Sequence, residues 1–407
     1  MRVIDIVEKD IMLLNTPCYI LDVNHLNRNV NALLNGFTTK WSGKVISGYS
    51  VKTNSLPWLI TYLKGKGFYA EVVSEQEYNL VKYLGFTNDK IILNGPVKSE
   101  QLLLETLNGG AVVNLDNDNE IVFLEKNYEK AEREWKVGLR YNFLLENECP
   151  EQTIVGGEHS RFGFCVENED FARAIERVRR IPGVTVAGLH GHNSTRSKSL
   201  LVFETIVRKA SELIHKYDIN AEYIDVGGGF FGDKPGTPSF DEYANVMEEA
   251  FDGNPGTTLI IEPGASIISS PISYLCKVVN TKDVIEKRFV TVNGSRIHID
   301  PMMHGIQFPK EIHTEYDWDD ELEIHSKQEL CGFTCIEMDR MGIIEGEKQL
   351  RSGDRILFKN CGSYSMTLSP LFISFFPTVY IYDDQSYKVV RYAWDETDFV
   401  RKCEVSL

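Results

Sequence analysis

Four kinds of chemically active residue follow short apolar runs that have the composition of buried strands. Lys52 ends the run KVISGYSVK, and Glu262 ends the run TLIIE further along the chain. Between these two lie the histidines of GLHGH (188–192) and the glycines of DVGGG (225–229). Lysine is among the residues least often buried, so its place at the end of an apolar run points to a chemical role. A partly desolvated lysine gives up its proton readily and can then form a Schiff base with a carbonyl group.

These residues together suggest one cofactor, although each of them has a simpler explanation alone. Gly227, Gly228 and Gly229 let backbone N–H groups approach a phosphate, but a tight turn without a ligand has the same composition. Lys52 could form only a structural ion pair with a neighbouring carboxylate, and Glu262 could merely cap a helix. A lysine, a phosphate loop and a carboxylate at one site are what pyridoxal phosphate requires, because its aldehyde, phosphate and ring nitrogen each need a partner.

Eight apolar runs alternate with segments whose apolar residues recur at three- and four-residue spacing, which is typical of helices. The runs are residues 44–52, 68–74, 90–95, 111–116, 136–142, 184–192, 222–228 and 258–264, and examples of the helical segments are 74–85, 171–181 and 203–217. This alternation predicts a parallel sheet, and eight units predict a (β/α)8 barrel. Lys52, Glu71, Arg140 and Glu262 would then meet at the C-terminal ends of the strands. We expect the segment 146–164, in a long gap between strands, to be a functional loop or an inserted hairpin.

The second part of the chain has a different texture. After about residue 270 the helical spacing fades, and β-rich runs such as YLCKVVNTK, DRILFKN and TVYIYDD dominate. The early run TPCYILDV (16–23) is also strand-like and could pair with them. We therefore expect an α/β fold with a TIM-like (β/α)8 barrel over residues 25–268. A mostly antiparallel β-domain, of β-sandwich or barrel type, is expected from residues 269–407 and 1–24, completed by that N-terminal strand.

Composition and charge exclude several classes of protein. The chain has 407 residues, 43% of them hydrophobic, and a formal net charge of −16, which argues against general nucleic-acid binding. Its eight cysteines suggest neither a disulfide framework nor a clustered zinc site. The N-terminus MRVIDIVEKD lacks the apolar core of a signal peptide, and no run of about 18 apolar residues occurs. We expect a cytoplasmic protein that binds no metal and no membrane.

From Thr16 to about Pro377 the chain resembles the fold-type III pyridoxal-phosphate-dependent decarboxylases, the group that includes diaminopimelate and ornithine decarboxylases and uses an alanine racemase-type barrel. The motifs that carry the resemblance occur in the family's order: YSVKTN (49–54), EVVSEQE (71–77), SRFGF (160–164), GLHGH (188–192), DVGGG (225–229), EPG (262–264), GFTCIEMD (332–339) and GSY (362–364). The resemblance implies an enzyme that uses pyridoxal 5'-phosphate to decarboxylate an amino acid.

The same resemblance implies roles for individual residues. Lys52 would form the aldimine with the cofactor, His192 would stack on the pyridine ring, and Glu262 would face the ring nitrogen. Cys335 would protonate the α-carbon once carbon dioxide has left. Family members are homodimers with shared active sites, so Cys335 would act in the site of the partner subunit. The further cofactor-binding residues expected are Glu71, Arg140, Thr195, Arg196, Gly227, Gly228, Gly229, Gly264 and Tyr364.

Departures from the family concentrate at positions that contact the substrate or the phosphate. Ala265 stands where the family has an arginine after EPG, and Asp300 stands where a second arginine precedes a proline. Thr195 would take the place of a phosphate-binding serine, and Arg196 would restore the charge lost at Ala265. Losing two cationic contacts should cost a distal carboxylate several kcal/mol, at about 1.5–3 kcal/mol for each charged hydrogen bond. We therefore do not expect meso-diaminopimelate to be the substrate.

The positions expected to contact the substrate favour an amino acid with a cationic or amide distal group, or a larger conjugated amino acid. They are Arg161, Asp300, His304, Ile336, Glu337 and Asp339.

Three other functions stay open. An amino-acid racemase on the same barrel usually needs a tyrosine base and an arginine at the ring nitrogen, whereas this chain has Cys335 and Glu262. A non-catalytic regulatory homologue would tend to lose the cofactor lysine, yet Lys52 is present. A metal-dependent hydrolase could use His190 and His192, because alternate residues of a strand share a face.

Overall fold

The computed structural model describes residues 10–154, 158–193, 195, 197–314 and 323–404. It contains two compact units, one formed by Asn29–Ile267 and one that combines Met1–Arg28 with Ile268–Leu407. Within the described residues, no helix is both long enough and apolar enough to cross a membrane.

Eight parallel strands of the first unit form a closed barrel, which confirms the fold predicted from the alternating runs. They are β2 (Val45–Ser50), β3 (Tyr69–Val72), β4 (Ile91–Leu93), β5 (Val112–Leu115), β6 (Trp135–Asn142), β8 (Val184–His190), β9 (Tyr223–Asp225) and β10 (Thr258–Ile261). The first and last strands close the circle, since Leu259 of β10 pairs with Val45 of β2. Because all eight run the same way, their C-terminal ends open on one face.

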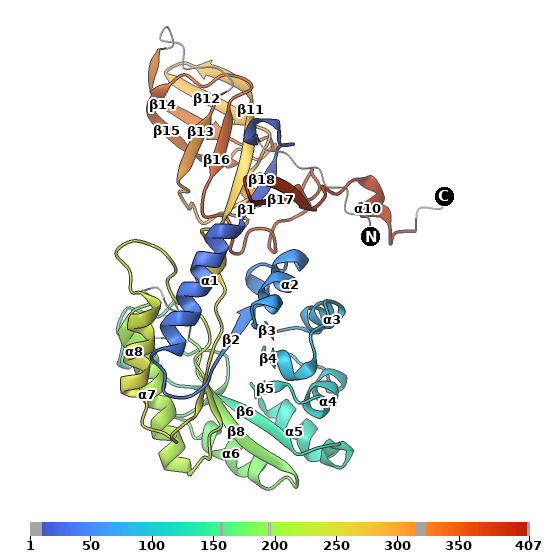
Figure 1. Cartoon of the computed structure of the whole chain (residues 1–407), viewed down its shortest axis with the longest axis vertical. Helices are drawn as coiled ribbons and strands as arrows, with labels where there is room; N and C mark the ends of the chain where they lie inside the picture. The colour runs from blue at the N-terminus through green and yellow to red at the C-terminus, as the bar shows by residue number, and fades with distance from the viewer. Residues whose placement is uncertain (1–9, 155–157, 194, 196, 315–322, 405–407) are drawn as a thin grey trace. The chain divides into compact units, whose positions relative to one another are not determined.

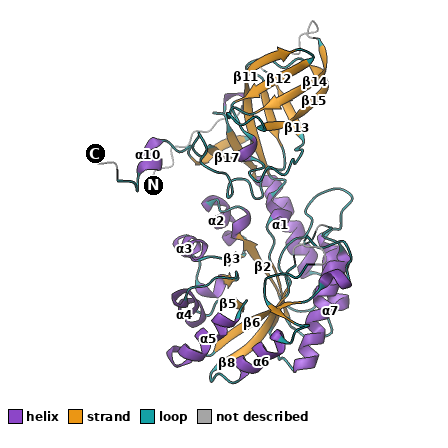
Figure 2. Cartoon of the chain, turned by 180° about the vertical axis from the view of Figure 1, so that it is seen from behind, coloured by secondary structure: helices purple, strands orange, loops and turns teal. Residues whose placement is uncertain are grey.

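Helices alternate with these strands and surround them (Figures 1 and 2). The helices up to the end of the barrel are α1 (Val23–Thr38), α2 (Pro57–Gly65), α3 (Glu75–Tyr83), α4 (Glu100–Asn108), α5 (Asp118–Asn127), α6 (Asp170–Arg179), α7 (Leu200–Tyr217), α8 (Phe240–Ala250) and α9 (Ala265–Ile268). Several begin at a serine whose side chain accepts a hydrogen bond from a free N–H group, as Ser74, Ser99 and Ser199 do. These caps fix where each loop at the strand ends gives way to a helix.

The barrel interior is filled around the ring of Tyr223 on β9. The buried residues that pack with it are Ile92, Ala187 and Ile260. Gly188 on the adjacent strand β8 leaves room for the ring, because a β-carbon there would lie 2.3 Å from it. The Tyr223 hydroxyl can therefore reach across the barrel and donate a hydrogen bond of 2.9 Å to Oδ1 of Asn114 on β5.

The segment between β6 and α6 leaves the regular pattern. Its strand β7 (Phe164–Cys165) pairs in parallel with β6, and Thr153 forms an isolated bridge with Thr195. The described part of residues 146–164 contains no antiparallel pairing of its own, so it forms a loop there rather than the inserted hairpin that was the alternative.

The second unit contains a mostly antiparallel sheet, as predicted for this part of the chain. Its described strands are β1 (Cys18–Asp22), β11 (Ile272–Val284), β12 (Lys287–Val292), β13 (Lys310–His313), β14 (Ile324–Cys331), β15 (Arg340–Lys348), β16 (Arg355–Phe358), β17 (Thr378–Asp383) and β18 (Ser386–Arg391), and a short helix α10 (Glu396–Val400) follows. Strand β1 pairs antiparallel with β11 and parallel with β17, so the N-terminal strand does complete this sheet. The buried residues that pack around β1 are Leu14, Cys18, Ile20, Leu275, Leu357 and Tyr380.

Candidate active site

Lys52 and Glu71 meet at the C-terminal ends of two neighbouring strands. β2 ends at Ser50, and the single turn η2 (Val51–Thr53) that follows it carries Lys52. The lysine Nζ lies 3.0 and 2.8 Å from Oε1 and Oε2 of Glu71, and Ser50 Oγ donates a further hydrogen bond to Oε2. Glu71 is buried, whereas the Lys52 side chain is 41% exposed. The ion pair that the sequence left open is therefore present, and the amine remains accessible.

Two histidines lie at the C-terminal end of β8: His190 is its last residue and is buried, and His192, two residues further on, is partly buried. Burial, together with the positive charges of Arg140 and Lys52, lowers the pKa of His192 to about 3, and the pKa of His190 is also far below its usual value. Neither ring nitrogen of His190, nor Nδ1 of His192, has a hydrogen-bond partner among the described residues. Buried polar atoms are normally hydrogen-bonded, so these orphaned nitrogens indicate a site that a ligand completes.

The three glycines after β9 pack closely beneath this site. A β-carbon on Gly227 would lie 2.3 Å from Nδ1 of His192, and one on Gly228 would lie 2.3 Å from the Glu262 carbonyl oxygen. Gly229 has a φ of 99°, and nothing lies within 4 Å of the place its β-carbon would occupy. The first two glycines therefore allow a close approach, and the third leaves open space where its β-carbon would lie, which is room that a phosphate at this loop could use.

Glu262 and Asp225 form a pair of buried carboxyl groups beside the glycine loop. A carboxylate oxygen of each lies within 4.8 Å of the other, and neither forms an ion pair with a described residue. Burial raises the pKa of Asp225 to about 7, and burial with the charges of Asp225 and Glu71 raises that of Glu262 well above its usual value. Burial would also raise the pKa of Glu71, but the charge of Lys52 and several hydrogen bonds hold it below its usual value. The Asp225–Glu262 pair therefore lacks a cation in direct contact, which a protonated ring nitrogen would supply.

Three side chains that the sequence did not single out belong to this network: Asn94, Asn114 and Asp225. Asn94 follows β4 and donates hydrogen bonds of 3.2 Å to Glu71 Oε1 and 2.5 Å to Glu262 Oε1. Asn114 lies within β5 and donates to Asn94 Oδ1 and Asp225 Oδ2 at 2.9 and 3.0 Å. The pattern that points to Lys52, a polar residue within or just after an apolar strand run, also occurs at these three residues and could have indicated them.

Comparison with known proteins decides the family. The model described as "Pyridoxal-dependent decarboxylase, pyridoxal binding domain" matches residues 24–269, which is more than half of the chain. The chain belongs to the pyridoxal-dependent decarboxylases. The diaminopimelate decarboxylase of Archaeoglobus fulgidus is 25% identical over 365 residues, covering 87% of this chain and 84% of that protein. The L-glutamyl-[BtrI acyl-carrier protein] decarboxylase of Niallia circulans is 24% identical and covers 95% of this chain and 93% of that protein.

A solved structure shares the fold of this decarboxylase. The diaminopimelate decarboxylase from M. jannaschi superimposes with a TM-score of 0.86 at 19% identity, covering 97% of this chain and 93% of that one. At this level of identity the likeness concerns the fold alone.

The barrel site fits pyridoxal phosphate, the cofactor of this family. The orphaned histidine nitrogens lie at the end of β8, and the open space beside Gly229 lies on the loop after the neighbouring strand β9. The Asp225–Glu262 pair beside them forms no ion pair with a described residue. Ligand atoms of His190, Asp225 and Glu262 also lie within 4.8 Å of one another, a spacing that a metal ion would allow. The family match favours the cofactor, because a metal would leave the lysine and the glycine loop without a function.

Arg140 and Arg161 flank the ring of Phe162 beside the mouth of the decarboxylase barrel. Their guanidinium carbons lie 4.7 and 4.1 Å from the ring centroid. Arg140 is buried and is already bonded to Asp116 Oδ1 and the His192 carbonyl oxygen, both at 3.2 Å. It therefore supports the His192 loop, whereas Arg161 is exposed. Arg196, the cation expected to replace the one lost at Ala265, lies outside the described residues.

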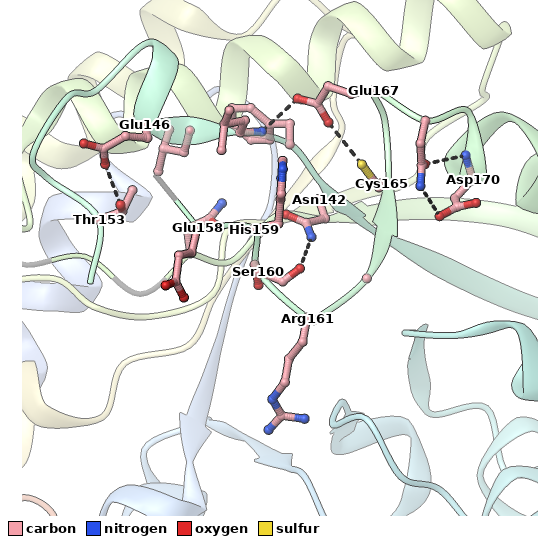
Figure 3. Close-up of a pocket in the computed structure, with 16 residues that line it drawn as sticks. Asn142, Glu146, Thr153, Glu158, His159, Ser160, Arg161, Cys165, Glu167 and Asp170 are labelled. Atoms are coloured by element: carbon pink, nitrogen blue, oxygen red, sulfur yellow. Dashed lines mark hydrogen bonds between the residues drawn. The ribbon is translucent and has the colours of Figure 1, made fainter. Parts of the chain in front are cut away.

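A cavity of about 460 Å³ lies beside this arginine pair (Figure 3). Its lining comes from the end of β6, the loop after it, β7 and the start of α6, and includes Glu146, Glu158, His159, Glu167 and Asp170. Figure 3 shows Arg161 extending away from the other labelled side chains. Because Asn142 and Asn193 also line the cavity, it opens near the strand ends that carry Arg140 and His192.

The other expected site residues belong to the second unit. Cys335 is exposed and forms no disulfide, Glu337 is exposed and paired with Arg340, and Tyr364 is 44% exposed. Ile336 is partly exposed, and His304 is exposed.

Asp339 and Asp300, which were expected to contact the substrate, are both buried and hydrogen-bonded within the second unit. Asp339 is 2% exposed, and its carboxylate accepts hydrogen bonds from Ser295 Oγ, the Arg296 N–H and Thr334. Asp300 is equally buried and pairs with Arg296, whose Nη2 lies 2.6 Å from Oδ2. It also accepts from the N–H groups of residues 304–306. Both carboxylates hold loops together in this structure, and a contact between either of them and a substrate stays a prediction.

Proposed function

We propose that this chain decarboxylates an α-amino acid, with pyridoxal phosphate bound at the barrel mouth between Lys52 and Glu262. The observation that carries the proposal is the buried Asp225–Glu262 pair, which forms no direct ion pair with a described residue yet lies in one network with Lys52. Burying an unpaired carboxylate is costly, and a protonated ring nitrogen would remove that cost.

Each residue then has a distinct task. When bound, pyridoxal phosphate supplies a protonated ring that accepts the electron pair left on the α-carbon as the carboxylate departs. Lys52 holds the cofactor through its amine, and the Glu71 carboxylate accepts hydrogen bonds from that amine. Glu262 holds the proton on the ring nitrogen, and the neutral ring of His192 offers a flat face to the cofactor. Cys335, an exposed thiol, would deliver the proton to the α-carbon.

The substrate proposal follows from the missing cations. Ala265 removes one arginine, and the structure shows that the remaining polar groups near the second position, Asp300 and Arg296, neutralise each other. Among the described residues, this ion pair leaves neither the Asp300 carboxylate nor the Arg296 guanidinium uncompensated for a distal cation or a distal carboxylate. We therefore favour an amino acid whose distal end is uncharged, either free or conjugated, over meso-diaminopimelate. By its name, the Niallia circulans relative acts on a glutamyl group attached to an acyl-carrier protein, which is an amino acid of the conjugated kind.

A substrate panel tests this proposal directly. The purified protein is loaded with pyridoxal phosphate and offered L- and D-α-amino acids, meso-diaminopimelate and carrier-linked amino acids, and carbon dioxide and amine product are measured. We expect release of carbon dioxide from an uncharged or conjugated substrate and little from meso-diaminopimelate. Turnover that is fastest with meso-diaminopimelate would contradict the substrate proposal, and loss of turnover on adding a chelator would favour the metal alternative.

A shared active site is the remaining part of the proposal. The second unit exposes apolar side chains on two segments, and a second copy of the chain would cover them; they are Met302, Met303, Ile306, Leu368, Leu371, Phe372 and Ile373. Mixing the Lys52→Ala and Cys335→Ala variants then forms hybrid dimers in which one of the two sites has both residues. Partial recovery of activity on mixing supports shared sites, and no recovery contradicts them.

A further inference from the structure

Asn94 lies between the two ends of the proposed cofactor site. Its amide nitrogen donates to Glu71, which binds the Lys52 amine, and to Glu262, which is proposed to face the ring nitrogen. Both hydrogens of this amide are thereby used by carboxylates on two different strands. Asn94 is 4% exposed, so water does not replace these bonds easily.

The direction of the hydrogen bonds in this network is fixed from its far end. The Tyr223 hydroxyl donates to Oδ1 of Asn114, so the amide nitrogen of Asn114 must face the other way, toward Asn94 and Asp225. The Asp225 carboxylate can only accept a hydrogen bond, so the group that Asn114 turns toward it must be the amide nitrogen. This second argument gives Asn114 the same orientation. Asn94 therefore receives a donor at its oxygen and presents its own nitrogen to Glu71 and Glu262. Tyr223 thus orients Asn94 through one intervening amide.

Several charged groups act on Glu262, in addition to the uncharged side chain of Asn94. Asp225 on β9 and Glu71 on β3 oppose its ionisation, and Lys52 after β2 favours it. Arg140 on β6 is close enough to interact electrostatically, and His190 on β8 lies within the same group but is neutral. Among the described residues, Asn94 is the uncharged side chain that donates a hydrogen bond to the Glu262 carboxylate.

We propose that Asn94 is a positioning residue that sets the pH at which the site accepts pyridoxal phosphate, by donating a hydrogen bond to ionised Glu262 in an orientation fixed by Tyr223 through Asn114. The inference rests on the proposed placement of the ring nitrogen at Glu262. When Glu262 is protonated, its O–H would face the N–H of a protonated ring nitrogen, and two hydrogen-bond donors would oppose each other. The affinity for the cofactor therefore falls at low pH. Removing the hydrogen bond from Asn94 makes ionisation of Glu262 harder, so the loss of affinity at low pH should begin at a higher pH.

The test measures binding of pyridoxine 5'-phosphate, which has the ring nitrogen and the phosphate but no aldehyde to react with Lys52. Its dissociation constant is determined by calorimetry as a function of pH for the wild type and for the variants Asn94→Ala and Tyr223→Phe. The acid-side midpoint should rise by about one pH unit in Asn94→Ala, and by a smaller amount in Tyr223→Phe. Tyr223→Phe removes one oxygen from a residue that does not touch Glu262, so it decides the question even where Asn94→Ala fails to fold.

A matched control separates this effect from the loss of any buried amide. Asn127, in α5, is also buried and bonded through both ends of its amide, to the Phe123 carbonyl oxygen and to Lys130. Asn127→Ala should leave the pH profile of binding unchanged. Weaker binding at every pH without a shift of the midpoint, in both site variants, would overturn the inference. A wild-type protein that does not bind the cofactor at all would instead overturn the proposed function.

Discussion

The Lys52 amine lies 2.8 Å from Oε2 of Glu71, and the strand register explains why these two residues meet. Ser50 of β2 pairs with Glu71 of β3, so a residue two positions beyond Ser50 can turn back over the end of the neighbouring strand. The turn η2 provides that reversal. The lysine is thereby held at the barrel mouth by a buried carboxylate while its side chain remains partly exposed.

Replacing Lys52 with alanine should abolish both cofactor attachment and turnover. The amine is the group that holds the cofactor, so the absorbance of the covalently bound cofactor should disappear, and release of carbon dioxide should fall by about a hundredfold or more. The matched control is Lys136, an exposed residue near the start of β6 that pairs with Glu222. Lys136→Ala lies at the opposite end of the barrel and should leave both signals unchanged. Normal absorbance in Lys52→Ala would contradict the assignment.

The same physical signals that predicted the barrel also explain what the sequence left out. Apolar runs between helical segments were sufficient to place the strands, because burial on both faces of a parallel sheet leaves a continuous apolar pattern. Lys52 and Glu262 stood out because a charged residue after such a run is unusual. Asn94 and Asn114 did not, since an asparagine at a strand end is equally typical of a turn. Their role depends on which strands are neighbours, which appears only once the barrel has closed.

Asp300 shows what a sequence motif does not predict. Its place before a proline indicated which residue of the family it replaces, but not which side chain lies beside it. Arg296 lies four positions earlier, on the turn η6 (Arg296–His298), and reaches the Asp300 carboxylate. A residue that replaces a functional residue of the family can therefore form an ion pair with a neighbour in the chain. A sequence motif alone does not reveal that ion pair.

Replacing Asp300 with alanine should destabilise the second unit. The change leaves the buried guanidinium of Arg296 without its carboxylate, which typically costs about 3–5 kcal/mol. Urea denaturation of the variant and the wild type measures this cost. The conservative variant Asp300→Asn keeps the size of the side chain and should also lose stability. If Asp300→Asn were as stable as the wild type but had a raised KM, Asp300 would be a substrate contact after all.

Replacing Asp225 with asparagine should change the pH dependence of stability in the cofactor-free protein. Burial raises the pKa of Asp225 to about 7, so between its unfolded value and about 7 the folded state binds more protons than the unfolded state. Stability of the wild type should therefore fall as pH rises through this window, by about 4 kcal/mol for this group, since one unit of pKa shift is worth about 1.4 kcal/mol. Asp225→Asn cannot titrate and should flatten the fall.

The measurement for Asp225 is a comparison of unfolding free energies at about pH 5 and about pH 8. The new amide donor faces the nitrogen of Asn114, which costs stability at both pH values, so the difference between them is the informative quantity. Asp118, an exposed acid at the start of α5, is the control, and Asp118→Asn should leave the slope unchanged. An unchanged slope in Asp225→Asn would show that Asp225 does not hold the proton.

Replacing Gly228 with alanine should disturb the glycine loop (227–229) that is proposed to bind the cofactor phosphate. The cause would be lack of space for the new β-carbon and not backbone strain. Gly228 lacks the left-handed φ of its neighbours, but its β-carbon would lie 2.3 Å from the Glu262 carbonyl oxygen, so the loop or β10 must move. Such overpacking typically costs about 1–3 kcal/mol of stability, and we expect cofactor affinity to fall by about tenfold or more. Gly65, at the end of α2, also has an ordinary φ, and nothing lies within 4 Å of its β-carbon position. Gly65→Ala should therefore change neither quantity, whereas a folded Gly228→Ala variant with wild-type affinity would show that the cofactor phosphate lies elsewhere.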